Sequence, residues 1–177
     1  MAISLYSDPI GKQRYIDKRT MNESKMSLDE YFNRLKTTTW IYVGNLSFFT
    51  QSNQIYHIFS MYGAVEEVIM GINKKTKLSC GFCFVRMATR TEAEFAVDCL
   101  NYSIIDDRVV RLDWDIGFTE GRQYGRGYQG GQVRDEVKGT VDKDRDIMVG
   151  RKRNFEYSDE PYLKKKRYEE NSNSEDD

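Results

Sequence analysis

The sequence lacks an excess of basic residues and lacks long apolar runs. Its 27 Lys and Arg residues are balanced by 28 Asp and Glu, giving a net charge of −1, whereas a protein that binds nucleic acid mainly through phosphates is strongly basic. No apolar run approaches the roughly 20 residues of a membrane helix, and the N-terminus lacks a charged-then-apolar signal pattern. We therefore expect no membrane contact.

Cysteine and histidine are scarce too. Cys80, Cys83 and Cys99 are an odd number in a chain without an export signal, which favours a reducing, intracellular compartment. "CGFC" has the spacing of a thiol redox motif, but it lies in a predicted strand, where an offset of three sends the two thiols to opposite faces. The single histidine, His57, falls on a helix surface. We expect no metal, no cofactor and no catalytic nucleophile, and therefore not an enzyme.

The sequence does contain a regular alternation of predicted elements between residues 40 and 115. Helices are predicted where apolar residues recur at i, i+3 and i+4, and strands where short β-prone runs occur. The predicted strands cover residues 40–45, 65–72, 79–87 and 108–115, and the predicted helices between them cover 52–62 and 91–100. One further helix is predicted before this region, at 27–36. Thr50 is the expected N-cap of the helix at 52–62, and Thr91 with Glu94 the expected capping box of the helix at 91–100.

The order β-α-β-β-α-β predicts an α+β, ferredoxin-like fold, with a four-stranded antiparallel sheet and both helices on one face. This domain (40–115) would follow an N-terminal arm (1–39) and precede a Gly/Arg-rich extension (116–137) and a charged, disordered tail (138–177). We expect the arms to be flexible. "GRGYQG" at 125–130 spells a dinucleotide-binding motif, but no strand precedes it and no helix follows it. A Gly-rich loop is the better interpretation.

The sheet face without helices is predicted to carry aromatic rings. Strand parity puts Phe82 and Phe84 on one face, and puts Tyr42 on the face opposite the aliphatic Ile41 and Val43. Three rings would then lie exposed together, as a platform on which RNA bases stack. "IYVGNL" (41–46) and, in part, "CGFCFVRM" (80–87) resemble the two signatures of the RNA-recognition-motif family. Departures from the second signature are Cys80, Cys83 and Met87.

Charged side chains beside the platform indicate which base it would take. Arg111, Asp113 and Asp115 share one face of the last strand, and nine acidic side chains outnumber seven basic ones between residues 40 and 115. Carboxylates accept the N1–H and N2 amino groups of guanine, and Arg donates to its O6. A cationic guanine gains further from an anion and from an aromatic face. The cap nucleoside 7-methylguanosine is such a base, and its triphosphate would engage the arginines that follow.

"DWDIGFTEGRQYGRG" and "GGQVRDE", together with the sheet domain, resemble the small subunits of nuclear cap-binding complexes, from about Tyr15 to Glu136. The resemblance implies that Tyr42 and a tyrosine of the N-terminal arm sandwich the methylated base. That second ring would be Tyr15, with Tyr6 as the alternative. It also implies that Asp115 and the Trp114 backbone contact the guanine edge.

The same resemblance implies further ligand-binding residues. Arg111 would contact guanine O6, and the rest of the set is Leu112, Asp113, Arg122, Gln123, Tyr124, Gly125, Arg126, Gln132 and Val133, supported by Phe82 and Phe84. Within this set, the phosphates and the second nucleotide would meet Arg122, Arg126, Gln132 and Val133. Val137 stands where the family pattern has an aromatic residue, and Tyr128 and Gln129 replace a more basic stretch.

The resemblance implies a non-enzymatic protein that binds the 5′ cap of RNA-polymerase-II transcripts and pairs with a large helical-repeat subunit. It would serve splicing, RNA export and quality control including nonsense-mediated decay, in the nucleus with shuttling to the cytoplasm. Both arms would order around ligand and partner. Basic clusters at 151–153 and 164–167 resemble a bipartite nuclear import signal, unless they belong to an ordinary solvated tail.

Other interpretations stay open at this point. The same platform could serve a general single-stranded-RNA splicing factor, or a protein-interaction module whose partner covers the sheet. Residues 116–134 could be an ordinary Arg/Gly-rich tail.

Overall fold

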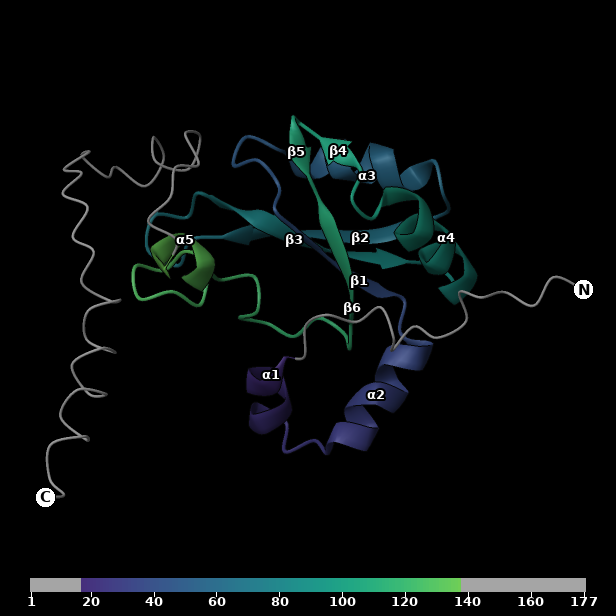
Figure 1. Cartoon of the computed structure of the whole chain (residues 1–177), viewed down its shortest axis with the longest axis horizontal. Coiled ribbons are helices and arrows are strands. Elements are labelled where there is room, and N and C mark those ends of the chain that lie inside the picture. The colour runs from purple at the N-terminus through teal and green to yellow at the C-terminus, as the bar shows by residue number, and fades with distance from the viewer. Residues whose placement is uncertain (1–16, 138–177) are drawn as a thin grey trace, which may run out of the picture.

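The computed structural model describes residues 17–137 (Figure 1), and its centre is the predicted four-stranded antiparallel sheet with two helices on one face. The predictions made for Tyr6, Tyr15, the basic clusters at 151–153 and 164–167, and the tail at 138–177 lie outside the described residues.

Within residues 17–137, eleven short elements follow one another. They are α1 (Lys18–Glu23), α2 (Leu28–Thr37), β1 (Trp40–Gly44), α3 (Ser52–Ser60), β2 (Val65–Ile72), β3 (Ser79–Met87), α4 (Arg90–Leu100), β4 (Ile104–Ile105), β5 (Arg108–Val109), β6 (Arg111–Asp115) and α5 (Val133–Val137). The sheet order is β2-β3-β1-β6, so β1 and β3 are central, and β2 and β6 are the two edges. In Figure 1, α3 and α4 lie together on one side of the sheet, whereas α1 and α2 lie beyond β1 and β6.

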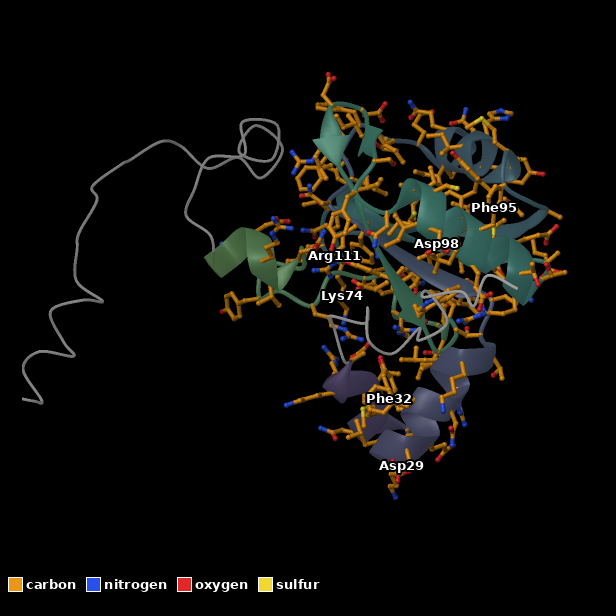
Figure 2. The ribbon with its side chains drawn as sticks, turned by 45° about the vertical axis from the view of Figure 1, so that its right-hand side comes forward. Asp29, Phe32, Lys74, Phe95, Asp98 and Arg111 are labelled. Atoms are coloured by element: carbon orange, nitrogen blue, oxygen red, sulfur yellow. The ribbon has the colours of Figure 1, made fainter. Side chains whose placement is uncertain are left out.

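The core lies between the sheet and α3 and α4, because alternate strand residues on that face are apolar. Ile41, Val43 and Val85 are fully buried there, and they pack with inward residues of the two helices such as Ile55 and Ala96. Outward residues of α4 face solvent, as Phe95 and Asp98 do in Figure 2. The face assignments made from strand parity are confirmed.

The last predicted strand is broken at Val110. Its N–H donates to the Ser103 carbonyl at 2.9 Å, and its own carbonyl accepts from the Tyr102 N–H at 3.0 Å. Residues 108–109 pair with 104–105 in a small hairpin, so that of the predicted strand only residues 111–115, which form β6, pair with β1. The alternation of the sequence continues through this break because Val110 is buried, as Leu112 and Trp114 are at the next alternate positions.

Both expected helix caps are displaced by one or two residues. The capping box of α4 is formed by Thr89 and Glu92, and that of α3 by Gln51 and Gln54. The Thr50 hydroxyl instead donates to Asp106 at 2.6 Å. The predictions for Thr50, and for Thr91 with Glu94, are thus wrong. Thr50 is engaged by Asp106 and leaves the cap of α3 to Gln51, and α4 begins at Arg90, which makes Thr89 its N-cap.

The N-terminal arm forms two helices rather than the one predicted. Asp17 caps the short α1 by accepting from the Thr20 N–H at 3.1 Å. Tyr31 of α2 is almost fully buried in the main core. Arg90 of α4 ties α2 in place, since its guanidinium donates to the Leu35 and Thr38 carbonyls at 2.8 and 2.7 Å.

Candidate nucleic-acid interface

The sheet face opposite α3 and α4 carries the predicted aromatic platform, but the platform is covered. The Tyr42 and Phe82 rings stack with centroids 5.7 Å apart, and Phe84 meets Tyr42 edge-on at 5.6 Å. Phe82 and Phe84 are only 5% and 3% exposed, so the prediction that these two rings lie open to solvent is wrong. The extension after β6 covers them: the Phe118 ring lies 5.6 Å from that of Phe84, and the Arg122 guanidinium lies 4.9 Å from it.

The Gly/Arg-rich extension crosses this face from one edge of the sheet to the other. It leaves the edge strand β6 and pairs with the end of the opposite edge strand, β2. The Ile72 N–H donates to the Gln123 carbonyl at 2.8 Å, and the Gly125 N–H donates to the Ile72 carbonyl at 3.0 Å. Further on, the Gln132 amide donates to the Cys80 carbonyl of β3. Figure 1 shows the extension, in green, running from β6 to α5 beside the far ends of β2 and β3.

Two glycines permit this path. At Gly125, a Cβ would lie 2.4 Å from the carbonyl carbon of Gly131, so no side chain fits. Gly130 has a φ of +87°, and a Cβ there would lie 2.8 Å from the Asn73 side-chain oxygen. The Asn73 amide also donates to the Gln129 carbonyl at 3.2 Å. The loop can approach the turn after β2 this closely only because these positions lack a Cβ.

A chain of ion pairs joins the sheet, the extension and α1. Arg122 donates to both oxygens of Asp115 at 2.6 Å each, and to Asp17 at 3.2 Å. Arg126 donates to both oxygens of Asp17 at 2.8 and 2.9 Å. The side chains of Asp17 and Arg122 are only 6% and 8% exposed, so these charges depend on one another rather than on water.

The ion pairs determine the direction in which the pKa values of Asp17 and Arg122 are shifted. Burial alone would raise the pKa of Asp17, but hydrogen bonds from Arg126 and Thr20 outweigh it and hold that pKa well below its usual range. Burial alone would lower the pKa of Arg122, but its bond to Asp115 reverses the effect, so the pKa is raised. Both groups are therefore charged at neutral pH.

The residue Tyr42 lies between two different neighbours on this face. Its partners across the sheet are Phe84 on β3 and Asp113 on β6. The Asp113 carboxylate lies 2.8 Å from Nε of Arg111, whose side chain is 40% exposed. An aromatic ring, a carboxylate and a guanidinium thus lie next to one another, as strand parity predicted.

Between the sheet face and the extension lies a cavity of about 330 Å³, near the lower end of the roughly 300–1,000 Å³ that small-molecule pockets span. The predicted site residues that line it are Tyr42, Phe82, Phe84, Arg111, Asp113, Trp114, Asp115, Arg122, Tyr124, Gly125, Arg126, Gln132 and Val133. Strands far apart in sequence and the extension therefore converge on one cavity.

Comparison with known proteins places this architecture in a family. A model described as RNA recognition motif matches residues 41–111. The chain is 45% identical over 141 residues to nuclear cap-binding protein subunit 2 of Salmo salar, over 78% of this chain and 88% of that protein. The chain is 53% identical over 111 residues to the same subunit of Xenopus tropicalis, over 63% of this chain and 72% of that protein. It is 50% identical over 117 residues to the subunit of Homo sapiens, over 66% of this chain and 75% of that protein. The chain belongs to the nuclear cap-binding protein subunit 2 family.

Membership of the nuclear cap-binding protein subunit 2 family rests on more than the sheet domain. The stretches aligned with these relatives are longer than the segment that the RNA recognition motif matches. The likeness therefore includes residues outside that segment.

Two predicted ligand residues do not line the cavity. Leu112 is 3% exposed and packs in the main core, because strand parity turns it away from Arg111 and Asp113. The Gln123 side chain is occupied within its own turn, where it accepts from the Gly121 N–H and donates to Glu120. The structure therefore does not bring the Leu112 and Gln123 side chains to the cavity, and their roles as ligand-binding residues stay predictions.

Trp114 lines the cavity, but its ring lies elsewhere. The Arg90 guanidinium stacks 3.5 Å from the ring centroid on the core side of the sheet. What Trp114 can offer a ligand is therefore its main chain, as the resemblance implied.

Five residues that line the cavity were missed by sequence reasoning. They are Asp17, Tyr31, Gly44, Asn45 and Arg134. Asp17 could have been suspected as the N-cap of a helix, since Asp is favoured there. Its pairing with Arg126, 109 residues away, has no local signal. Tyr31 lies in the helix predicted at 27–36, and its hydroxyl accepts from the Asp17 N–H at 3.2 Å.

The described residues support the exclusion of redox chemistry. Cys80 and Cys83 are free thiols in two different buried clusters, one on each side of the sheet. Burial raises the pKa of the Cys83 thiol, which suppresses the thiolate that redox chemistry needs. Within residues 17–137, no helix is long and apolar enough to cross a membrane, and no three His, Cys, Asp or Glu side chains group so as to hold a metal ion.

Proposed function

We propose that this chain binds the 7-methylguanosine cap of RNA-polymerase-II transcripts, as the small subunit of a nuclear cap-binding heterodimer. The observation that carries the proposal is the cavity that brings Tyr42, Arg111 and Asp115 of the sheet against Arg122 and Arg126 of the extension. The names of its relatives, nuclear cap-binding protein subunit 2, support the same ligand.

The methylated base stacks on Tyr42 in this proposal. Its positive charge favours an aromatic face and a carboxylate at the same time. Asp115 accepts from the guanine N1–H and N2 amino groups, the Trp114 main chain contacts the same edge, and Arg111 donates to O6. The carboxylates that repel phosphate therefore serve the base, and the arginines serve the triphosphate.

The second stacking ring is Tyr15 in this proposal, and Asp17 supports that choice over Tyr6. Asp17 lines the cavity, and two residues of chain span at most about 7 Å. Tyr15 precedes this anchor by two positions in the sequence, whereas Tyr6 precedes it by eleven.

Binding requires an exchange of partners around Asp115. In the structure, both of its oxygens accept hydrogen bonds from Arg122. Guanine takes those oxygens in the proposed complex, and Arg122 is released toward the triphosphate. Asp17 retains Arg126 and keeps the second arginine near the phosphates.

The proposed setting follows from the family. The relatives are named as subunits of a nuclear assembly, and the resemblance implies a large helical-repeat partner. Exposed apolar side chains on the helical face, such as Met61 and Phe95 at 70% and 55% exposure, offer that partner a contact surface. Splicing, RNA export and quality control, with shuttling between nucleus and cytoplasm, are the roles we propose for the complex. None of these roles requires catalysis by this chain.

The alternatives fit the structure less well. A general single-stranded-RNA binder stacks successive bases on open rings, whereas Phe82 and Phe84 are buried here. A protein-interaction module would need the same face for a partner, whereas the chain's own extension covers it through Phe118.

Retention on 7-methyl-GTP resin tests the proposal. The full-length chain should be retained, and Tyr42→Ala should abolish retention. Tyr56→Ala is the matched control, because Tyr56 is a half-exposed tyrosine of α3, on the helical side of the sheet. Retention of Tyr42→Ala at the level of the control would refute a stacking role for Tyr42.

A further inference from the structure

A second surface, outside the cavity, combines lysines with aromatic rings. The turn after β2 carries Lys74, Lys75 and Lys77, and it lies against the extension, where Tyr124 and Tyr128 are found. The Lys77 ammonium lies 4.7 Å from the Tyr124 ring centroid, and that of Lys75 lies 5.5 Å from the Tyr128 ring centroid. Figure 2 places Lys74 at the side of the sheet that carries the extension, away from α4.

Tyr128 is unusual among these residues because its ring is 91% exposed, more than any other large apolar or aromatic side chain within residues 17–137. Folding gains almost nothing from a ring that stays in water. Its loop is held instead by backbone contacts: the Lys74 N–H donates to the Gly130 carbonyl at 2.9 Å, and the Gly127 N–H donates to the Gly131 carbonyl at 2.7 Å. The ring is therefore presented to solvent on a loop whose backbone is held in place by hydrogen bonds.

No carboxylate among the described side chains, those of residues 17–135, forms an ion pair with any of the three lysines. Lysines that alternate with exposed aromatic rings are the pattern of surfaces that bind single-stranded nucleic acid, in which cations meet the backbone and rings stack on bases. An acidic protein partner would use only the lysines, and an apolar one would use only the aromatic rings.

The surface is continuous with the cavity. Tyr124 lines the cavity and also lies beneath the Lys77 ammonium. Arg126, next along the extension, lines the cavity as well. A chain that leaves the cavity on the β2 side meets Lys77 and Tyr124 first, and Lys75 and Tyr128 beyond them.

We infer that Lys74, Lys75, Lys77 and Tyr128 form a subsite for the single-stranded RNA that follows the cap, in which Tyr128 stacks on a base and the lysines contact phosphates. The inference rests on the proposed function, because it takes the cavity as the place of the capped end. Stacking on a ring does not depend on which base is present, so the subsite adds affinity for RNA length rather than for sequence.

Binding of three ligands to the full-length chain tests the subsite: 7-methyl-GTP, a capped RNA decamer and the same decamer uncapped. Tyr128→Ala should weaken binding of the capped decamer about 5-fold or more and leave binding of 7-methyl-GTP unchanged. Tyr128→Phe should restore it, because the ring is what stacks. Tyr56→Ala on α3 is the matched control and should change neither.

The lysines have a separate readout. Replacing Lys74, Lys75 and Lys77 together by Gln should reduce the slope of log Kd against log salt for the capped decamer by about 2, since each contact with a single-stranded phosphate contributes roughly 0.7. Binding of 7-methyl-GTP should keep its slope.

Three results would overturn the subsite. These are an unchanged decamer affinity in Tyr128→Ala, an equal loss for decamer and 7-methyl-GTP, and a failure of Tyr128→Phe to restore binding. Failure of the cap proposal looks different: the wild-type chain would then bind 7-methyl-GTP no better than GTP. In that case the uncapped decamer still decides the subsite, through its dependence on Tyr128.

Discussion

Arg122 binds both oxygens of the Asp115 carboxylate at 2.6 Å each, and both side chains are only 8% exposed. The carboxylate that we propose to bind guanine is therefore paired with the arginine that we propose to contact the phosphates. One exchange would then free both groups for their ligands, so that the base and the triphosphate are recognised together.

Asp115→Asn should weaken binding of 7-methyl-GTP by about 10-fold or more, because a charge-assisted hydrogen bond contributes roughly 1.5–3 kcal/mol. Binding of plain GTP should fall less, since its guanine carries no positive charge. Fluorescence titration with both nucleotides measures the change in selectivity. Asp107→Asn, an exposed acid in the β4–β5 hairpin, is the control and should leave both affinities intact. Equal losses for the two nucleotides would count against a role of Asp115 in methyl selectivity.

Asp17→Asn should destabilise the docking of the extension onto α1. It removes the carboxylate that accepts from Arg126 and Arg122 and leaves Arg126 without its buried partner. We expect a loss of roughly 1–3 kcal/mol in the free energy of unfolding, measured by urea denaturation. Asp29→Asn, on the exposed side of α2 (Figure 2), should change stability by less than about 0.5 kcal/mol. If the two variants unfold alike, the ion-pair chain does not stabilise the extension.

The contribution of Asp17 should also depend on pH. Its folded pKa is lowered, so its stabilisation is complete above the unfolded pKa of about 4 and is lost as pH falls from there toward the folded value. The stability difference between wild type and Asp17→Asn should therefore be constant near neutral pH and shrink below about pH 4. Urea denaturation of both proteins between neutral and acidic pH gives this difference, and a difference that stays constant into acid would contradict the lowered pKa.

Arg90→Lys should destabilise the packing of α2 against the sheet. Lysine cannot keep the two hydrogen bonds to the Leu35 and Thr38 carbonyls while stacking on Trp114. The expected loss in the free energy of unfolding is about 1–3 kcal/mol. Arg90 also forms an ion pair with Glu94, four residues on, at 2.9 Å. Arg19→Lys is the matched control, because Arg19 forms the same kind of pair with Glu23 but is 60% exposed. A similar small effect in both variants would show that the ion pair, rather than the carbonyl contacts, is what Arg90 contributes.

Thr89→Ala should cost about 1 kcal/mol of stability, because Thr89 is the N-cap of α4 and accepts from the Glu92 N–H. Thr91→Ala should cost less than about 0.5 kcal/mol, as an exposed position inside the helix. Thermal or urea unfolding of the two variants compares them directly. A larger loss of stability in Thr91→Ala than in Thr89→Ala would instead support Thr91 as the N-cap of α4, as the sequence pattern predicted.

The sheet domain could be predicted from sequence because its signals are periodic and local. Parity alone placed Tyr42, Arg111, Asp113 and Asp115 on one face, and the register confirms it. The choice of Thr89 over Thr91 as cap could not be made, since both precede a glutamate at the spacing of a capping box.

The cover over the platform was also beyond reach of the sequence. The extension has no hydrophobic periodicity, so its sequence does not indicate which surface it packs against. The burial of Phe82 and Phe84 and the pairing of Asp17 with Arg126 could therefore be seen only in the structure. The resemblance identified the extension as part of the site. It could not tell that Leu112 faces the core, which strand parity alone would have shown.

Titration of the full-length chain with 7-methyl-GTP and with GTP, followed by quenching of its intrinsic fluorescence, tests the central claim most directly. Two aromatic rings and a carboxylate around a cationic base predict a preference for the methylated nucleotide of about 2–4 kcal/mol, or roughly 30-fold to 1,000-fold. Equal affinities for the two nucleotides would contradict the account.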